Sequence, residues 1–154
     1  MNGKFTCWFS NRWVVMAARL ILAVTFLYAG IEKLRDPLAF ADSIASFQIL
    51  PDALINLVAL SLPVLEIFLG LMLLTDYEAG LAALTTLILM AVFIVALISA
   101  LVRGLEVDCG CFGSSEPSVW QMYLTIGRDL LFGAMAWLVL VTDFKKQPTP
   151  ENEA

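Results

Sequence analysis

The chain has 154 residues, of which 60% are hydrophobic and 15% are charged, and its formal net charge is −5. The acidic balance gives no indication of nucleic-acid binding, and the absence of histidine excludes histidine-based acid–base catalysis and histidine-ligated haem or zinc. A soluble domain is usually about half apolar and a quarter charged, so this excess of apolar residues, collected into long runs, predicts an integral membrane protein.

Four apolar runs are each long enough to cross a hydrocarbon core of about 30 Å as a helix with a rise of ~1.5 Å per residue. They cover residues 13–31, 53–74, 79–102 and 119–141. The first contains Arg19 and is followed by no small-x-small cleavage site, so we expect a retained helix rather than a signal peptide. Because backbone amides in lipid must be satisfied internally, the sequence predicts an all-α, four-helix transmembrane bundle in a single domain.

An even number of spans places both chain termini on one side of the membrane. The expected terminal side carries Lys4, Arg12, Lys145 and Lys146, and the opposite side carries Lys33, Arg35 and Arg103. Four basic residues against three favour a cytoplasmic location for the two terminal segments, residues 1–12 and 143–154. The second of these segments is polar and contains proline, so we expect a disordered tail. Cys7 would then lie on the opposite side of the membrane from Cys109 and Cys111, which lie in the connector between the third and fourth spans, and could not pair with them.

A short amphipathic helix is predicted in the connector between the first two spans. Asp36 is a candidate N-cap, and Pro37 suits the first helical position. Phe40, Ile44 and Phe47 then recur at helical spacing. We expect this helix to lie at the membrane interface, on the same side as the connector between the third and fourth spans, either as a cap over the end of the bundle or as a docking surface.

Four charged residues fall within the predicted spans: Arg19, Glu66, Arg128 and Asp129. A charge at the bilayer centre costs at least ~2.5–3.5 kcal/mol on insertion scales, so these residues are expected to face each other or a wet cavity. From the helical rise, Arg19 lies about 9 Å and Glu66 about 12 Å from the same end of the bundle, so the two are expected to pair, with Arg128 also within reach of Glu66. Asp129 is expected on a different helix face from Arg128. The group forms either an ion-pair network that orders the helices or a pocket for a ligand or protons.

The sequence "VDCGCFGSS" places Cys109 and Cys111 one residue apart in the connector between the last two spans. Cysteines at this spacing can form only a small, strained disulfide ring, which is more reducible, while Gly110 and Gly113 make the loop adaptable. Because the ring closes almost no loop, a purely structural disulfide would gain little entropic stabilisation. Two thiolates can hold a soft ion such as Cu(I), but no third cysteine is expected on that side. The residues favour a redox pair, with a metal site and a structural cross-link as the alternatives.

Taken together, four segments resemble the MauE branch of the DoxX-like membrane proteins, the methylamine utilisation family. The segments are "AGIEKLRDPLAFADSIASFQILP" (29–51), "LPVLEIFLG" (62–70), "RGLEVDCGCFG" (103–113) and "GRDLLFGAMA" (127–136). Their combined order is specific, whereas any one of them alone is not. The positions that match the family pattern are Lys33, Asp36, Pro37, Glu66, Arg103, Cys109, Cys111, Gly113 and Arg128. Asp129 stands where asparagine is expected.

The resemblance implies a bacterial inner-membrane protein whose cysteine pair faces the periplasm. It also implies a thioredoxin-like periplasmic partner and a role in maturing the disulfide-rich small subunit of methylamine dehydrogenase. The layout is similar to that of DsbB and vitamin K epoxide reductase, which pass electrons between cysteines and quinone. Those enzymes use a C-x-x-C pair, which this chain lacks.

We therefore predict a membrane thiol–disulfide redox protein in which Cys109 and Cys111 exchange with the partner. Lys33 and Arg103 would stabilise the thiolate, and Asp36 would support the loop structure on that side.

Quinone is the candidate cofactor in this hypothesis. Its pocket is predicted around Arg19, Glu66 and Arg128, and the expected aromatic walls are Tyr28, Trp120 and Tyr123. The alternatives are a non-enzymatic assembly factor or anchor that docks its partner on Phe40, Ile44 and Phe47, and a protein that handles Cu(I) or another metal.

Overall fold

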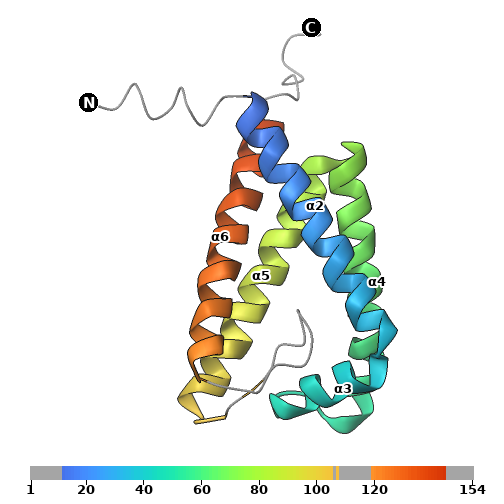
Figure 1. Cartoon of the computed structure of the whole chain (residues 1–154), viewed down its shortest axis with the longest axis vertical. Coiled ribbons are helices and arrows are strands. Elements are labelled where there is room, and N and C mark those ends of the chain that lie inside the picture. The colour runs from blue at the N-terminus through green and yellow to red at the C-terminus, as the bar shows by residue number, and fades with distance from the viewer. Residues whose placement is uncertain (1–11, 106, 108–118, 145–154) are drawn as a thin grey trace, which may run out of the picture.

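The computed structural model of the protein describes residues 12–105, 107 and 119–144 (Figure 1). The helices are α2 (Arg12–Arg35), α3 (Pro37–Ser46), α4 (Asp52–Thr75), α5 (Ala79–Val102) and α6 (Val119–Phe144). All but α3 are long and apolar enough to cross a membrane. The predicted all-α architecture is confirmed, and the largest difference in a boundary is the end of the first span, predicted at residue 31 and found at Arg35. The predictions for the two terminal segments fall largely outside the described residues, which begin at Arg12 and end at Phe144.

Helix α3 begins where local signals predict it. The Asp36 side chain caps the helix, with Oδ1 accepting a hydrogen bond from the Ala39 N–H at 3.0 Å, and Pro37 occupies the first helical position. The helix stops at Ser46, and Gln48 then takes a positive φ of 50°, which cannot continue a right-handed helix. Both predictions for the start of this helix are confirmed.

Helix α5 ends in a Schellman motif. Gly104 has φ +68°, a left-handed conformation that glycine adopts without steric cost. Its N–H donates to the Leu101 carbonyl at 3.1 Å, and the Leu105 N–H donates to the Ala100 carbonyl at 3.0 Å. The chain therefore turns back toward the bundle, and Val107 is only 3% exposed.

The long helices form two closely packed pairs, α2 with α4 and α5 with α6. The start of α2 and the end of α6 lie at one end of the bundle, and α3 lies at the other (Figure 1). At the first end the pairs meet through a cluster that includes Ala18, Ala83 and Val139. The ends of α5 and α6 that flank the cysteine connector lie at the same end as α3 (Figure 1).

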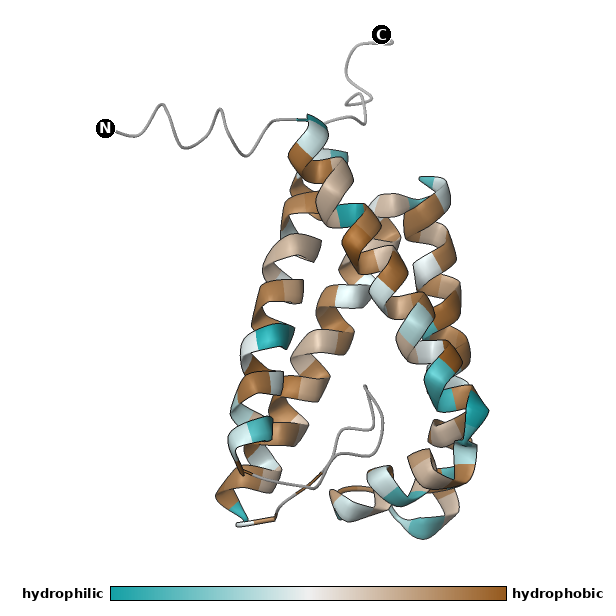
Figure 2. Ribbon diagram, in the orientation of Figure 1, coloured by the Kyte–Doolittle hydropathy of each residue, from teal (hydrophilic) through white to brown (hydrophobic). Residues whose placement is uncertain are grey.

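The outward faces of the long helices are apolar, as Figure 2 shows by the brown colour along most of their length. Large side chains such as Leu57, Val95 and Trp137 are more than half exposed, and α5 carries no charged residue at all. In water such a surface would associate, whereas lipid tails cover it without cost. The chain is therefore built as a multi-pass membrane protein.

Two glycines allow α2 and α4 to approach closely. A Cβ placed on Gly30 would lie 2.7 Å from Ile67 Cγ1 and 2.8 Å from the Pro63 carbonyl oxygen. A Cβ on Gly70 would lie 3.0 Å from the Ala23 carbonyl oxygen. Small residues at such contacts let transmembrane helices pack backbone to backbone, which is the main source of their association in lipid.

We predict that Gly30→Ala and Gly70→Ala each destabilise the protein, because the added methyl group must displace backbone atoms of the facing helix. The expected loss is about 1–3 kcal/mol, the usual cost of overpacking, measured as a lower midpoint of thermal unfolding in detergent. Gly127→Ala is the matched control, since nothing lies within 4 Å of its Cβ position. A control variant as unstable as the other two would contradict the proposed close contact.

Candidate functional site

A buried ion pair joins α2 to α4. The Lys33 ammonium donates a hydrogen bond to Glu66 Oε1, and the two side chains are only 1% and 4% exposed. Side chains on a helix tilt toward its N-terminus, and α2 and α4 run in opposite directions. The Lys33 side chain therefore leans from the end of α2 into the bundle, and that of Glu66 leans toward it.

Aromatic rings from two further helices surround the Lys33 ammonium. Its nitrogen lies 5.1 Å from the centroid of the Phe40 ring on α3 and 5.6 Å from that of the Phe93 ring on α5. Ring faces attract cations, most strongly where water is excluded. Lys33 thus contacts α3, α4 and α5 from α2, and its charge is fixed at the centre of this end of the bundle.

A second ion pair lies within α6. Arg128 Nε and Nη2 donate to Asp129 Oδ1 at 3.0 and 2.8 Å, and Asp129 is 2% exposed. Arg128 Cζ also lies 5.9 Å from the centroid of the Phe132 ring. Adjacent helix positions do point in different directions, but the arginine side chain is long enough to bend back to its neighbour.

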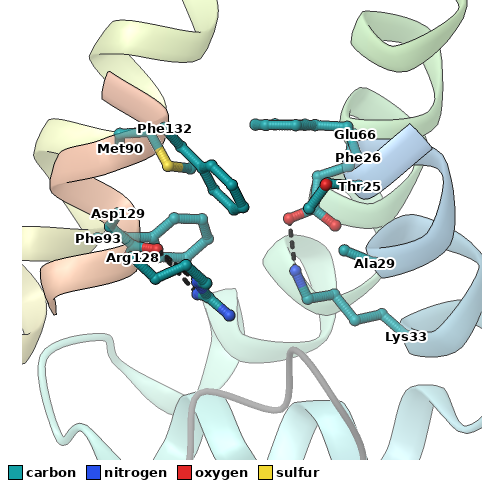
Figure 3. A pocket seen from close by; sticks show the side chains of 10 residues that line it. All are labelled: Thr25, Phe26, Ala29, Lys33, Glu66, Met90, Phe93, Arg128, Asp129 and Phe132. Carbon is teal, nitrogen blue, oxygen red and sulfur yellow. Dashed lines mark hydrogen bonds and ion pairs between the residues drawn. The ribbon is translucent and has the colours of Figure 1, made fainter. Parts of the chain in front are cut away.

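The two ion pairs stand on opposite walls of a small cavity between the helix pairs (Figure 3). The cavity has a volume of about 30 Å³, which is room enough for a water molecule. Glu66 Oε2 is buried and has no hydrogen-bond partner among the described residues. The lining residues are Thr25, Phe26, Ala29, Lys33, Glu66, Met90, Phe93, Arg128, Asp129 and Phe132.

This arrangement sets what the cavity can do chemically. Both cations are paired with carboxylates, so the site carries no net charge from these four groups. It offers one unpartnered carboxylate oxygen beside aromatic walls. Such a site can accept a hydrogen bond or a proton from a small neutral group, but it offers no surplus positive charge to an anion.

The structure corrects the predicted position of Arg19. Its guanidinium pairs with Asp76, the residue that follows α4, and not with Glu66. Arg19 lies on α2, where side chains tilt toward the helix start, so its long side chain extends toward the membrane surface rather than the midplane. Asp76 is ten residues beyond Glu66, which is about 15 Å along the helix, so Arg19 does not belong to the cavity.

The structure also corrects the predicted aromatic walls. Tyr28, Trp120 and Tyr123 are 49%, 71% and 54% exposed and do not line the cavity. Phenylalanines take that place: Phe26, Phe93 and Phe132.

The face of α3 that carries the candidate docking residues Phe40, Ile44 and Phe47 is turned largely toward the bundle. Phe40 is 5% exposed and packs with Ala41 and Ala59, and Ile44 and Phe47 are half-buried. This face of α3 covers the end of the bundle and leaves little apolar surface for a partner. Helix α3 therefore acts as a cap over the bundle end, which was the other expectation for it.

Lys33 was placed by sequence in a connector on the side of the cysteines, and the structure puts it inside the bundle instead. Arg103 remains at that end, where Nη1 donates to the carbonyls of Phe47 and Gln48 at 2.9 and 3.3 Å. Arg103 therefore ties the end of α3 to the end of α5. Cys109, Gly110, Cys111 and Gly113 lie outside the described residues, as does Cys7.

Comparison with known proteins places the chain in a family. The family profile described as "Methylamine utilisation protein MauE" matches residues 11–142, which include every residue of the cavity. The chain belongs to the MauE family. Whether that family is a branch of the DoxX-like proteins stays a prediction.

Three curated relatives carry the name "Methylamine utilization protein MauE". The chain is 36% identical to the protein of Paracoccus denitrificans, over 80% of this chain and 66% of the relative. It is 34% identical to the Paracoccus versutus protein, over 78% and 64%, and 33% identical to that of Methylorubrum extorquens, over 83% and 71%. The matched part thus spans about two thirds of each relative. No solved structure matches the chain.

We predict that Lys33→Met destabilises the protein strongly, because it leaves the Glu66 carboxylate buried without its cation. Breaking a buried pair by removing one partner typically costs about 3–5 kcal/mol. The double variant Lys33→Met/Glu66→Leu should recover most of this loss, as both charges are gone. The measurement is thermal or denaturant unfolding in detergent for the single and double variants.

Arg35→Met is the control for this cycle. Its partner Glu32 lies at 2.5 Å, but the Arg35 side chain is 71% exposed, so the expected change is within about 0.5 kcal/mol. A double variant less stable than Lys33→Met alone would show that the two side chains do not act as a pair.

Proposed function

We propose that this protein is an inner-membrane thiol–disulfide redox protein whose Cys109 and Cys111 exchange disulfides with a periplasmic thioredoxin-like partner. The observation that carries the proposal is the Cys-Gly-Cys spacing in the connector between α5 and α6. A disulfide in so small a ring is strained, and strain makes it a better oxidant. Such a bond suits exchange better than it suits a permanent cross-link.

The flanking residues support exchange at the α3 end of the bundle. Residues 108–118 lie outside the described part of the chain, but both of their attachment points are defined. Val107 packs with Leu97 and Met122, and Val119 begins α6 at the same end. The connector that carries the cysteines is therefore joined to the bundle beside α3.

Charge distribution supports a periplasmic location for that end, with both termini in the cytoplasm. The sequence places four basic residues on the terminal side and three on the other. One of those three, Lys33, is buried and paired with Glu66, so fewer basic residues remain in the connectors of that side. A smaller number of Lys and Arg residues in connectors is typical of the exported side. Disulfides also persist in that compartment.

The exchange step conserves electrons and protons. A thiolate of the reduced partner attacks one sulfur of the Cys109–Cys111 disulfide, forming a mixed disulfide and releasing the other cysteine as a thiolate. The partner's second thiolate then attacks the mixed disulfide. The partner leaves with a disulfide, and Cys109 and Cys111 are left reduced after gaining two electrons. Arg103 is the cation that would stabilise the released thiolate, since it forms no ion pair within the described ranges.

The family supports a role in methylamine metabolism. The relatives are named for methylamine utilisation. We infer that the periplasmic partner carries oxidising equivalents for a disulfide-rich enzyme of that system, with the small subunit of methylamine dehydrogenase as the substrate to be matured.

We predict that either Cys109→Ser or Cys111→Ser abolishes mixed-disulfide trapping, because a disulfide needs both sulfurs before a thiolate can attack it. The probe is reduced thioredoxin whose second active-site cysteine is replaced by serine, added to the purified protein in proteoliposomes. Trapped complex is measured on non-reducing gels, with Cys7→Ser as the matched control that should trap as well as the unaltered chain. Equal trapping in both single variants would overturn the proposed exchange.

Orientation has its own test, with a maleimide-linked polymer applied to sealed right-side-out vesicles. Two thiols should react only after treatment with a membrane-impermeant reductant, and Cys7 should react only after the membrane is opened. Labelling of Cys109 and Cys111 without reductant would contradict a disulfide and would favour an assembly factor with idle cysteines or a metal-handling protein. Labelling only in opened vesicles would reverse the topology.

A further inference from the structure

A second, larger cavity adjoins the first. It has a volume of about 240 Å³ and lies between α3, α4 and α5. It shares three lining residues with the small polar cavity: Phe93, Arg128 and Asp129. Its other lining residues are Phe40, Ser43, Ile44, Phe47, Ile49, Leu50, Val58, Leu62, Leu89, Val92, Ala96 and Leu97. All of these except Ser43 are apolar, so the two cavities together have one polar end and one long apolar end.

Part of the lining of the larger cavity is exposed at the surface of the bundle. Helices α4 and α5 are joined by a short turn at one end and diverge toward α3 (Figure 1). Among its lining residues, Val92 on α5 is 57% exposed, and Ile49, in the connector between α3 and α4, is 49% exposed. At its inner end the cavity is lined by Arg128 and Asp129.

We propose that this pair of cavities binds a lipid-soluble quinone, with its ring against Phe93 and a carbonyl oxygen directed at the polar end. The unpartnered Oε2 of Glu66, on a residue only 3% exposed, is the second observation that points to a ligand there. A buried carboxylate oxygen without a donor is costly, and a hydroxyl group of the reduced quinone, or a water beside it, would supply one.

Charge distinguishes a quinone from a phospholipid as the occupant. A phosphate headgroup brings negative charge, and it needs positive charge that is not already balanced. Lys33 is paired with Glu66, and Arg128 with Asp129, so no surplus positive charge is available from these groups. A neutral quinone ring brings no charge to be balanced. Arg128, whose side chain carries N–H groups, lines the wall shared by the two cavities, and the larger cavity is otherwise almost entirely apolar.

The choice of a quinone rather than another neutral amphiphile rests on the proposed thiol–disulfide exchange. That exchange leaves Cys109 and Cys111 as a dithiol, which must be reoxidised. A dithiol and a quinone react to give a disulfide and a hydroquinone, so two electrons and two protons leave the sulfurs and reduce the two carbonyls to hydroxyls. Glu66 and Asp129 would then be positioning residues that hydrogen-bond the reduced ring.

The test is photolabelling of the full-length protein in proteoliposomes with an azido-ubiquinone analogue, in competition with decylubiquinone. We expect labelled peptides from α3, α4 or α5 and loss of the label when the competitor is added. Ala96→Phe fills the larger cavity and should lower the labelling at least tenfold. Ala91→Phe is the matched control, on the same helix but exposed and outside the lining, and should label as the unaltered chain does.

A second variant guards against misfolding of the first. Val58→Phe narrows the same cavity from α4, and Leu57→Phe is its exposed neighbour and control. Organic extracts of the purified protein should contain quinone, and less of it in both cavity-filling variants than in both controls. Equal labelling in all four variants, or extracts that contain phospholipid alone, would overturn the proposed site.

The thiol–disulfide exchange and the quinone site can be disproved independently of each other. Trapping with the thioredoxin probe starts from the oxidised cysteine pair and requires no quinone, so Ala96→Phe should trap as well as the unaltered chain. Specific labelling without trapping would overturn the exchange and leave the quinone site standing. Trapping without specific labelling would overturn the quinone site and leave the exchange standing.

Discussion

The close contact between α2 and α4 is the constraint on which the rest of this structure depends. Gly30 and Gly70 bring the two backbones together, and that spacing places Lys33 within reach of Glu66. Each of these charges alone would cost at least ~2.5–3.5 kcal/mol at the centre of a bilayer on insertion scales. Because the two are buried only as a pair, any change that separates the helices also exposes an unmatched charge. Gly30 and Gly70 therefore support the polar site by setting the spacing of the two helices, although they do not line the cavity.

Each ion pair that involves a cavity residue lies within one helix pair. Lys33–Glu66 belongs to α2 and α4, and Arg128–Asp129 belongs to α6. The pair Arg19–Asp76 again ties α2 to the end of α4. Between the two helix pairs, the described contacts include apolar packing and the ring of Phe93 beside Lys33.

The sequence predicts the helices well because their signals are local. Run length identifies the four spans, and a capping aspartate before a proline identifies the start of α3. The partners inside the bundle are harder to predict. In a soluble helix one apolar face marks the core, but lipid-facing surfaces are as apolar as the interior, so composition does not reveal how a spanning helix is rotated. Phe93 therefore could not be distinguished from apolar residues on the lipid side, and exposed Tyr28 was wrongly predicted as a wall.

Depth alone was also insufficient to pair the charges. Counting residues from the helix end makes Arg19 and Glu66 level, but a long side chain extends toward the start of its own helix. On α2 this direction carries Arg19 away from Glu66 and carries Lys33 toward it. The direction of each helix, together with the length of each side chain, gives the observed partners. Helix direction and side-chain length can both be read from the sequence, but the predicted first span ended at residue 31 and therefore left Lys33 outside the helix.

The proposed chemistry requires the cysteine connector and the cavities to share one end of the bundle, and two contacts link the described start of the connector to the cavity wall. Arg103, at the end of α5, hydrogen-bonds the carbonyl of Phe47 at the end of α3. Val107 packs in a cluster that Phe47 adjoins, and Phe47 lines the larger cavity. The chain that leads into the cysteines is thus in contact with a residue of the cavity wall.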